Sequence, residues 1–146
     1  MKTRTETTRI IWHHTVSGDV SAETIDKWHR ERGFAQIGYH YLIRFGGTRE
    51  TGRDIRLVGA HAKGRNHDSI GVAVCGDFDK HYPQYEQLVA CKHLYHQLSR
   101  IFGVLKNEFH SHVLTLPNQY SQKPFYPCPG RLLDRVHFIK EMEASL

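Results

Sequence analysis

The sequence has no apolar run of about 18 residues and no apolar segment of the secretory type near its start. The first absence excludes a hydrophobic membrane-spanning helix. The second argues against an export signal of that type, so we expect synthesis in the cytoplasm. Internal repeats, low-complexity tracts and linkers are also missing. The 146 residues, of which 39% are hydrophobic and 24% charged, are typical of one globular domain with its own core. We assign that domain to 10–146, after a polar, frayed arm at 1–9.

Cysteine is scarce, because the chain has only Cys75, Cys91 and Cys128, an odd number at wide spacing. This pattern excludes a disulfide framework and a local zinc knuckle, and it indicates a reducing compartment. Charge of one sign is not concentrated either. Twenty Lys and Arg residues oppose 15 Asp and Glu residues, and the basic ones form no block of five or six. The net charge of +5 favours polyanionic partners, but this scatter predicts a mixed-charge surface rather than a nucleic-acid-binding stripe.

Histidine, in contrast, is abundant, with 12 residues in the chain. Histidine is the commonest metal ligand and titrates near neutral pH, so the composition points to a metal site or an acid–base site. The hydrophobic pattern predicts strands interleaved with helices, which is typical of an α/β domain with a mixed sheet. In the helix expected over 22–32, Ile25 and Trp28 are expected to face the core. The expected strands are 9–12, 39–45, 48–52, 69–76 and a short one from 107, and the expected helices are 22–32, 84–102 and 131–142.

Three candidate metal ligands lie where predicted elements end. His13 follows the first strand, His110 follows another strand, and Cys128 lies in a proline-rich loop, 115–130, before the last helix. Two imidazoles and one thiolate would leave one position of a tetrahedral Zn²⁺ open, as in a catalytic zinc site. No pair of these residues has the tight spacing of HExxH or CxxC motifs. A pair of surface histidines and a small buried cysteine therefore stays open as the alternative.

Five sequence blocks carry a resemblance to a known family. They are IIWHHTVS, GYHYLIRFGGTRETGRD, VGAHAKGRNHDSIGVAVCGD, FHSH and YPCPG, and they occur in this order between residues 10 and 136. Together they resemble the type-2 N-acetylmuramoyl-L-alanine amidases, a family that includes small phage enzymes and the peptidoglycan recognition proteins. The resemblance is greatest to the small phage enzymes. It implies a single α/β domain with a mixed sheet of about five strands, flanked by helices, and a zinc cleft at the strand ends.

The resemblance also assigns roles to single residues. It implies one zinc ion per chain, with His13, His110 and Cys128 as ligands, the last of which is Asp in some relatives. Close phage relatives carry a lysine two residues before this cysteine, where the present chain has Tyr126. The expected oxyanion-stabilising group is therefore either Tyr126 or Lys123. The catalytic tyrosine of the family maps to Tyr39. The expected substrate-groove positions are His61, Lys63, Asn66 and His112. The proton donor to the leaving amine is expected to be either His112 or Tyr39.

The activity that the resemblance implies is zinc-dependent hydrolysis of the amide between N-acetylmuramic acid and L-alanine in bacterial peptidoglycan, as in phage endolysins. The alternative is a non-catalytic peptidoglycan-binding recognition protein. Members of the family that lack catalytic activity have usually lost the cysteine ligand, which is present here at Cys128. We expect a monomer that acts on the cell wall. One phage relative also binds an RNA polymerase through its N-terminal arm, but the arm at 1–9 is too generic to support that role.

Overall fold

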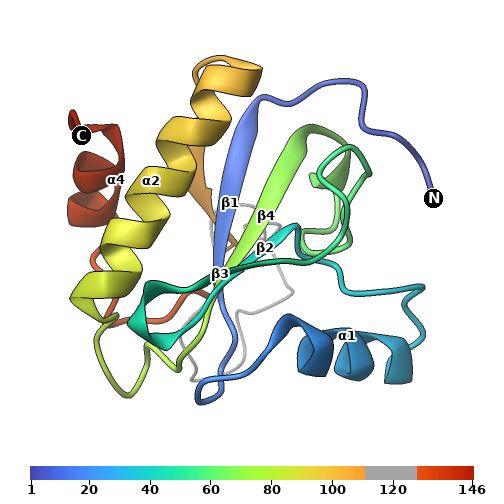
Figure 1. Ribbon diagram of the computed structural model, residues 1–146, viewed down its shortest axis with the longest axis horizontal. Helices are drawn as coiled ribbons and strands as arrows, with labels where there is room; N and C mark the ends of the chain where they lie inside the picture. The colour runs from blue at the N-terminus through green and yellow to red at the C-terminus, as the bar shows by residue number, and fades with distance from the viewer. Residues whose placement is uncertain (111–127) are drawn as a thin grey trace.

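The computed structural model describes residues 1–110 and 128–146. Its centre is a five-stranded sheet in which one edge strand is antiparallel and the other four strands are parallel (Figure 1). This arrangement confirms the expected α/β domain with a mixed sheet. In order across the sheet, the strands are β3 (Arg49–Thr51), β2 (Tyr41–Ile43), β4 (Ser69–Val74), β1 (Arg9–His14) and β5 (Lys106–Phe109).

The two central strands, β1 and β4, are buried along almost their whole length. Residues 10–12 of β1 and 70–74 of β4 are continuous apolar runs because helices cover both faces of the sheet, as is usual for parallel strands. In the register of the sheet, His13 lies opposite Ala73, and Trp12 lies opposite Phe109 of β5. Since β1 and β5 are parallel, their carboxyl ends meet at the same edge of the sheet. His13 and His110 therefore both lie at this edge.

Helices pack on both faces of the sheet. α2 (Tyr85–Phe102) and α4 (Arg135–Glu143) lie side by side on one face, and α1 (Ala22–Glu31) lies on the other (Figure 1). Trp12 anchors the larger core, with its ring 4.9 Å from that of Phe138 and its indole N–H donating to Asn107 Oδ1 at 2.9 Å. The smaller core contains Ile25, Ile37, Leu42, Ala73 and Cys75.

The helix ends agree with the sequence pattern at α1 and differ at α4. Ser21 caps α1 by accepting a hydrogen bond from Thr24 N at 3.1 Å. Trp28, expected in the core, is 39% exposed, and His29 takes the buried position beside it. α4 begins at Arg135 and not at 131, because the side chain of Asp134 accepts from His137 N at 3.0 Å and so caps the helix there.

The turn between β2 and β3 forms at Gly46 and Gly47, the two residues between the expected strands 39–45 and 48–52. Gly46 and Gly47 have φ angles of 78° and 91°, which other residues adopt only with strain. A Cβ atom on Gly47 would also lie 2.6 Å from the carbonyl oxygen of Glu86 at the start of α2. The turn therefore needs glycine both for its backbone conformation and for its close packing against the helix.

The N-terminal arm is docked on the domain, so the expectation of a frayed segment was wrong. Thr3 and Leu57 form an antiparallel bridge, and Arg4 N donates to Arg56 O at 2.7 Å. Arg4 is 9% exposed, and its guanidinium donates to Leu57 O at 3.0 Å. The pattern of polar residues did not reveal this contact because the arm binds through its backbone and one buried guanidinium.

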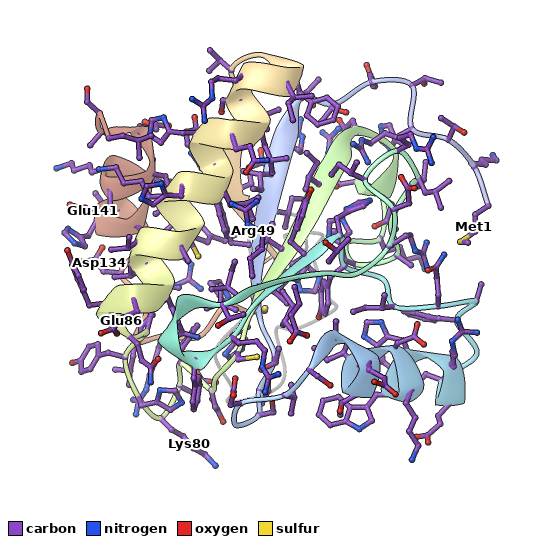
Figure 2. The ribbon with its side chains drawn as sticks, viewed as in Figure 1. Met1, Arg49, Lys80, Glu86, Asp134 and Glu141 are labelled. Carbon is purple, nitrogen blue, oxygen red and sulfur yellow. The ribbon has the colours of Figure 1, made fainter. Side chains whose placement is uncertain are left out.

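The surface around α2 and α4 carries charges of both signs, as the scatter of charged residues predicted. Lys80, Glu86 and Glu141 are exposed and extend outward in Figure 2. Within residues 1–110 and 128–146, none of the helices combines the length and the apolar character that crossing a lipid bilayer would require.

His40 makes the stability of the fold depend on pH. It is fully buried, its Nδ1 accepts from Gly71 N at 3.0 Å, and its Nε2 donates to Leu57 O at 2.8 Å. The pKa of His40 is lowered from 6.5 to about 4, mainly by burial and also by the nearby Arg4 and Arg53, against the opposing effects of the Leu57 carbonyl and Asp54.

Between about pH 4 and pH 6.5, the unfolded chain therefore binds a proton that folded His40 does not. We expect His40 alone to reduce the free energy of unfolding by about 2 kcal/mol between pH 7 and pH 5. Urea unfolding in a chelating buffer, at both pH values, measures this change. His40→Asn should show a smaller loss than the wild type, whereas the exposed control His93→Asn should show the same loss. Equal losses in His40→Asn and the wild type would contradict the assignment.

Candidate metal centre and adjoining pocket

Three potential metal ligands from distant parts of the chain converge at the carboxyl edge of the sheet. His13 is the fifth residue of β1, and His110 comes directly after β5. Cys128 reaches the same place from the segment before α4, where its Sγ accepts a hydrogen bond from His14 N at 3.2 Å. One nitrogen of each imidazole and the Cys128 sulfur all lie within 4.8 Å of one another. The structure thus brings together the three residues predicted as ligands.

The chemistry of this donor set fits a zinc ion. Zinc bonds of about 2.0–2.3 Å place tetrahedral donors about 3.4–3.6 Å apart, so small side-chain movements would close these three residues around one ion. Burial lowers the pKa of His110 to about 4 and keeps that of His13 well below its ordinary value, so both rings are neutral and offer a lone pair. Burial also raises the pKa of the Cys128 thiol to about 12. A buried thiol of this kind ionises readily only beside a strong positive charge such as Zn²⁺.

Tyr39 stands next to this centre. Its ring centroid is 5.0 Å from that of His13 and 5.4 Å from that of His29. Burial raises the pKa of the Tyr39 phenol well above its ordinary value, and the nearby Cys128 raises it further, so the hydroxyl keeps its proton at neutral pH. None of the hydrogen bonds among the described residues engages this hydroxyl, which leaves it able to donate to a bound molecule.

A pocket of about 360 Å³ opens beside the three ligands. It contains Tyr39 and His110 from the centre, and all three of the described residues that were predicted to bind substrate. Two cationic side chains, Arg32 and Lys63, are exposed at its wall. The complete lining is His29, Arg32, Phe34, Tyr39, Ala60, His61, Ala62, Lys63, Asn66 and His110.

The predicted groove residues differ in what they contact. Lys63 is exposed, as a residue that meets a ligand should be. The side chain of Asn66 instead supports the loop, because its Oδ1 accepts from the backbone N–H groups of His61 and Ala62, each at 2.9 Å. The ring of His61 lies between His13 and Ser69. Its Nδ1 is 2.9 Å from His13 Nε2, and its Nε2 is 3.2 Å from Ser69 Oγ.

Some pocket residues had no signal in the sequence pattern. Arg32 lies just beyond α1, and its guanidinium packs 5.5 Å from the ring centroid of Phe34. A helix end followed by glycine is common, so neither residue stood out before the fold was known. The neighbouring His29 is held against the loop, because its Nδ1 accepts from Gly38 N at 2.9 Å. The other predicted site residues, His112, Lys123 and Tyr126, lie outside the described part of the chain.

Sequence comparison relates the chain to phage enzymes. It is 49% identical to the endolysin of Escherichia phage T7 over 63 residues, which are 43% of this chain and 42% of that protein. It is also 43% identical to the endolysin of Klebsiella phage KP32 over 79 residues, which are 52% of each protein. The chain therefore matches about half the length of these curated relatives.

The fold and the family agree with this relationship. The amidase LysC from Clostridium intestinale superposes with a TM-score of 0.82 at 27% identity, over 99% of this chain and 95% of that one. Residues 3–131 match the family described as N-acetylmuramoyl-L-alanine amidase, and these residues are most of the chain. They include all three converging ligands and the whole pocket wall. The chain therefore belongs to the N-acetylmuramoyl-L-alanine amidase family.

Proposed function

We propose that the protein is a zinc-dependent peptidoglycan hydrolase of the endolysin type, which cleaves the amide between N-acetylmuramic acid and L-alanine. The observation that carries this proposal is the convergence of His13, His110 and Cys128 beside a pocket that contains Tyr39. The family match and the phage endolysins among its relatives support the same substrate class. The cell wall is then the place of action and peptidoglycan the partner.

The chain's own residues divide the chemistry between them. His13, His110 and Cys128 would hold one zinc ion, which when bound supplies an acidified water and a Lewis acid for the scissile carbonyl. Tyr39 would donate its hydroxyl proton in a hydrogen bond to the oxygen on which negative charge develops as the amide is attacked. Its raised pKa suits this role, because the phenol remains a donor throughout the neutral range.

The cations at the pocket wall would attract the substrate. Arg32 and Lys63 are exposed beside the centre, and the carboxylates of a peptide stem are negatively charged. Contacts with the peptide stem would not involve the reacting bond, so they would contribute mainly to binding and orientation. The expected oxyanion-stabilising role of Lys123 or Tyr126 remains part of the proposal, as does His112 as an alternative donor to the leaving amine.

Metal removal tests the proposal. We expect the purified protein to clear isolated cell walls and to release new L-alanine amino groups, and to lose this activity after dialysis against a strong chelator. One equivalent of Zn²⁺ should restore the rate, whereas Mg²⁺ should not, because imidazole and thiolate ligands favour zinc over hard oxygen-seeking cations. The measurement is the amine released per minute, with total zinc determined in the same samples.

Two outcomes would count against this function. Full activity of the chelated protein would exclude a role for the metal. Binding of muropeptides without release of amines, in protein that carries zinc, would instead support a non-catalytic recognition protein. The complete set of three ligands favours the enzyme over this alternative.

A further inference from the structure

We propose that His61 is a positioning residue for the metal centre, and that together with Ser69 it fixes His13 so that Nδ1 of His13 faces the metal. This inference rests on the proposed function, because it takes His13 as a zinc ligand. It also replaces the role in substrate contact that the family resemblance implied for His61. Three hydrogen bonds in sequence, from Ser69 to Arg65, from His61 to Ser69 and from His13 to His61, determine the donors one after another.

The chain begins at Ser69, the first residue of β4. Its Oγ lies 2.6 Å from the carbonyl oxygen of Arg65, and a carbonyl can only accept, so the Ser69 hydroxyl donates there. The hydroxyl has no second proton to give. His61 Nε2, at 3.2 Å from the same oxygen, must therefore be the donor in its contact with Ser69.

The protonation of His61 then determines that of His13. A neutral imidazole carries one N–H, so with Nε2 as the donor, His61 Nδ1 is left as an acceptor. It lies 2.9 Å from His13 Nε2, and this contact is a hydrogen bond only when His13 donates. The His13 ring then carries its proton on Nε2, and the lone pair on Nδ1 is free to bind a metal ion.

The fold holds the His61 ring in this position from several sides. A Cβ atom on Gly71 of β4 would lie 2.5 Å from the ring, and one on Gly59 would lie 2.8 Å from it, so the two glycines make the space that the ring occupies. Asn66 holds the backbone of His61 from the other side of the loop. Since both ring nitrogens are already engaged by protein atoms, the side chain of His61 has no polar atom left for a substrate.

A ligand histidine is commonly held by a second group that accepts from its other ring nitrogen, and loss of that group typically weakens metal binding by about 10–100-fold. Here the second group is His61, and the third is the Ser69 hydroxyl. His61→Ala should therefore weaken zinc binding by about 10–100-fold. His61→Asn should recover most of the affinity, because its Oδ1 can occupy the place of Nδ1 and accept from His13. The matched control is His67→Ala, which removes an exposed histidine from the same loop.

Zinc dissociation constants, measured by competition with a chromophoric chelator, report the affinity of each variant. Imidazole ¹⁵N spectra of the wild-type protein report the protonated nitrogen of His13 and need no substitution. We expect Nε2–H in the metal-free protein, and zinc on Nδ1 after loading. Wild-type affinity in His61→Ala, protonation of His13 at Nδ1 in the metal-free protein, or zinc on Nε2 would each overturn the proposal.

Failure of the proposed function would look different. If the wild-type protein released no amines from cell walls, but His13 carried its proton on Nε2 and His61→Ala lost zinc affinity, the positioning role would hold without the enzyme activity. If the protein released amines, but His13 was protonated on Nδ1 and His61→Ala kept its zinc affinity, the hydrolase function would be supported and only the positioning role of His61 would be refuted.

Discussion

Replacing Cys128 by alanine is expected to remove both the zinc and the activity of this protein. The substitution leaves only His13 and His110 of the three converging ligands, and it removes the only anionic one. Two imidazoles alone hold zinc weakly, because structural and catalytic zinc sites in proteins use at least three protein ligands. Turnover of peptidoglycan should fall by several orders of magnitude, and zinc per chain should fall from about one to near zero.

The measurements for Cys128→Ala are metal analysis of the purified protein and the rate of amine release from cell walls. A matched control is Cys75→Ala, which removes a buried thiol that donates to Val20 O outside the site. It should keep its zinc and its rate. Cys128→Asp adds a second comparison, since a carboxylate is also an anionic zinc ligand and should retain part of the metal. Undiminished zinc and activity in Cys128→Ala would refute the assignment of the site.

The second large effect is expected for Tyr39→Phe. This change removes only the phenol hydroxyl. The Tyr39 ring lies in the wall of the pocket, with its centroid 5.0 Å from that of His13. Loss of one preorganised donor to a developing oxyanion typically lowers the rate by about 10²–10³-fold, because the donor stabilises the transition state more than the bound substrate. We therefore expect a fall of this size in kcat with little change in KM.

Zinc affinity separates this role of Tyr39 from a structural one. Tyr39 is not among the three converging ligands, so Tyr39→Phe should bind zinc as tightly as the wild type. Tyr95→Phe is a suitable control, because it removes a buried hydroxyl that donates to Leu105 O at 3.1 Å, far from the site in the fold. That variant should lose some stability and keep its kcat. If Tyr39→Phe kept the full rate, the phenol would not be the oxyanion donor.

Several local features could be predicted because each depends on neighbours in the chain. The apolar run before His13 predicted a strand with a polar end, and the helix expected over 22–32 begins at Ala22 as predicted. The expected strands 39–45 and 48–52 left only Gly46 and Gly47 between them, and these residues form the tight turn, whose backbone conformation is strained for other residues. The predicted ligands His13, His110 and Cys128 also lie together. Their spacing alone had left open a pair of surface histidines and a small buried cysteine.

Other features depended on how elements rotate and dock. Trp28 and His29 are adjacent on α1 and lie about 100° apart around its axis, so the rotation of the helix decides which of them is buried. His29 takes the inner position because Gly38 N gives its ring a hydrogen-bond donor, and Trp28 is left at the surface. The arm at 1–9 also looked free, because a bridge between Thr3 and Leu57 cannot be read from either segment alone.

Hydrophobic periodicity and five short motifs were enough to indicate the α/β class, the family and the residues that could bind a metal. These predictions depend on short stretches of sequence, such as polar residues at the end of an apolar strand or beside a turn. The proton order from Ser69 through His61 to His13 could emerge only in the folded chain. It depends on contacts between a loop and two strands, and on the space left by Gly59 and Gly71, and no spacing along the chain encodes such distances.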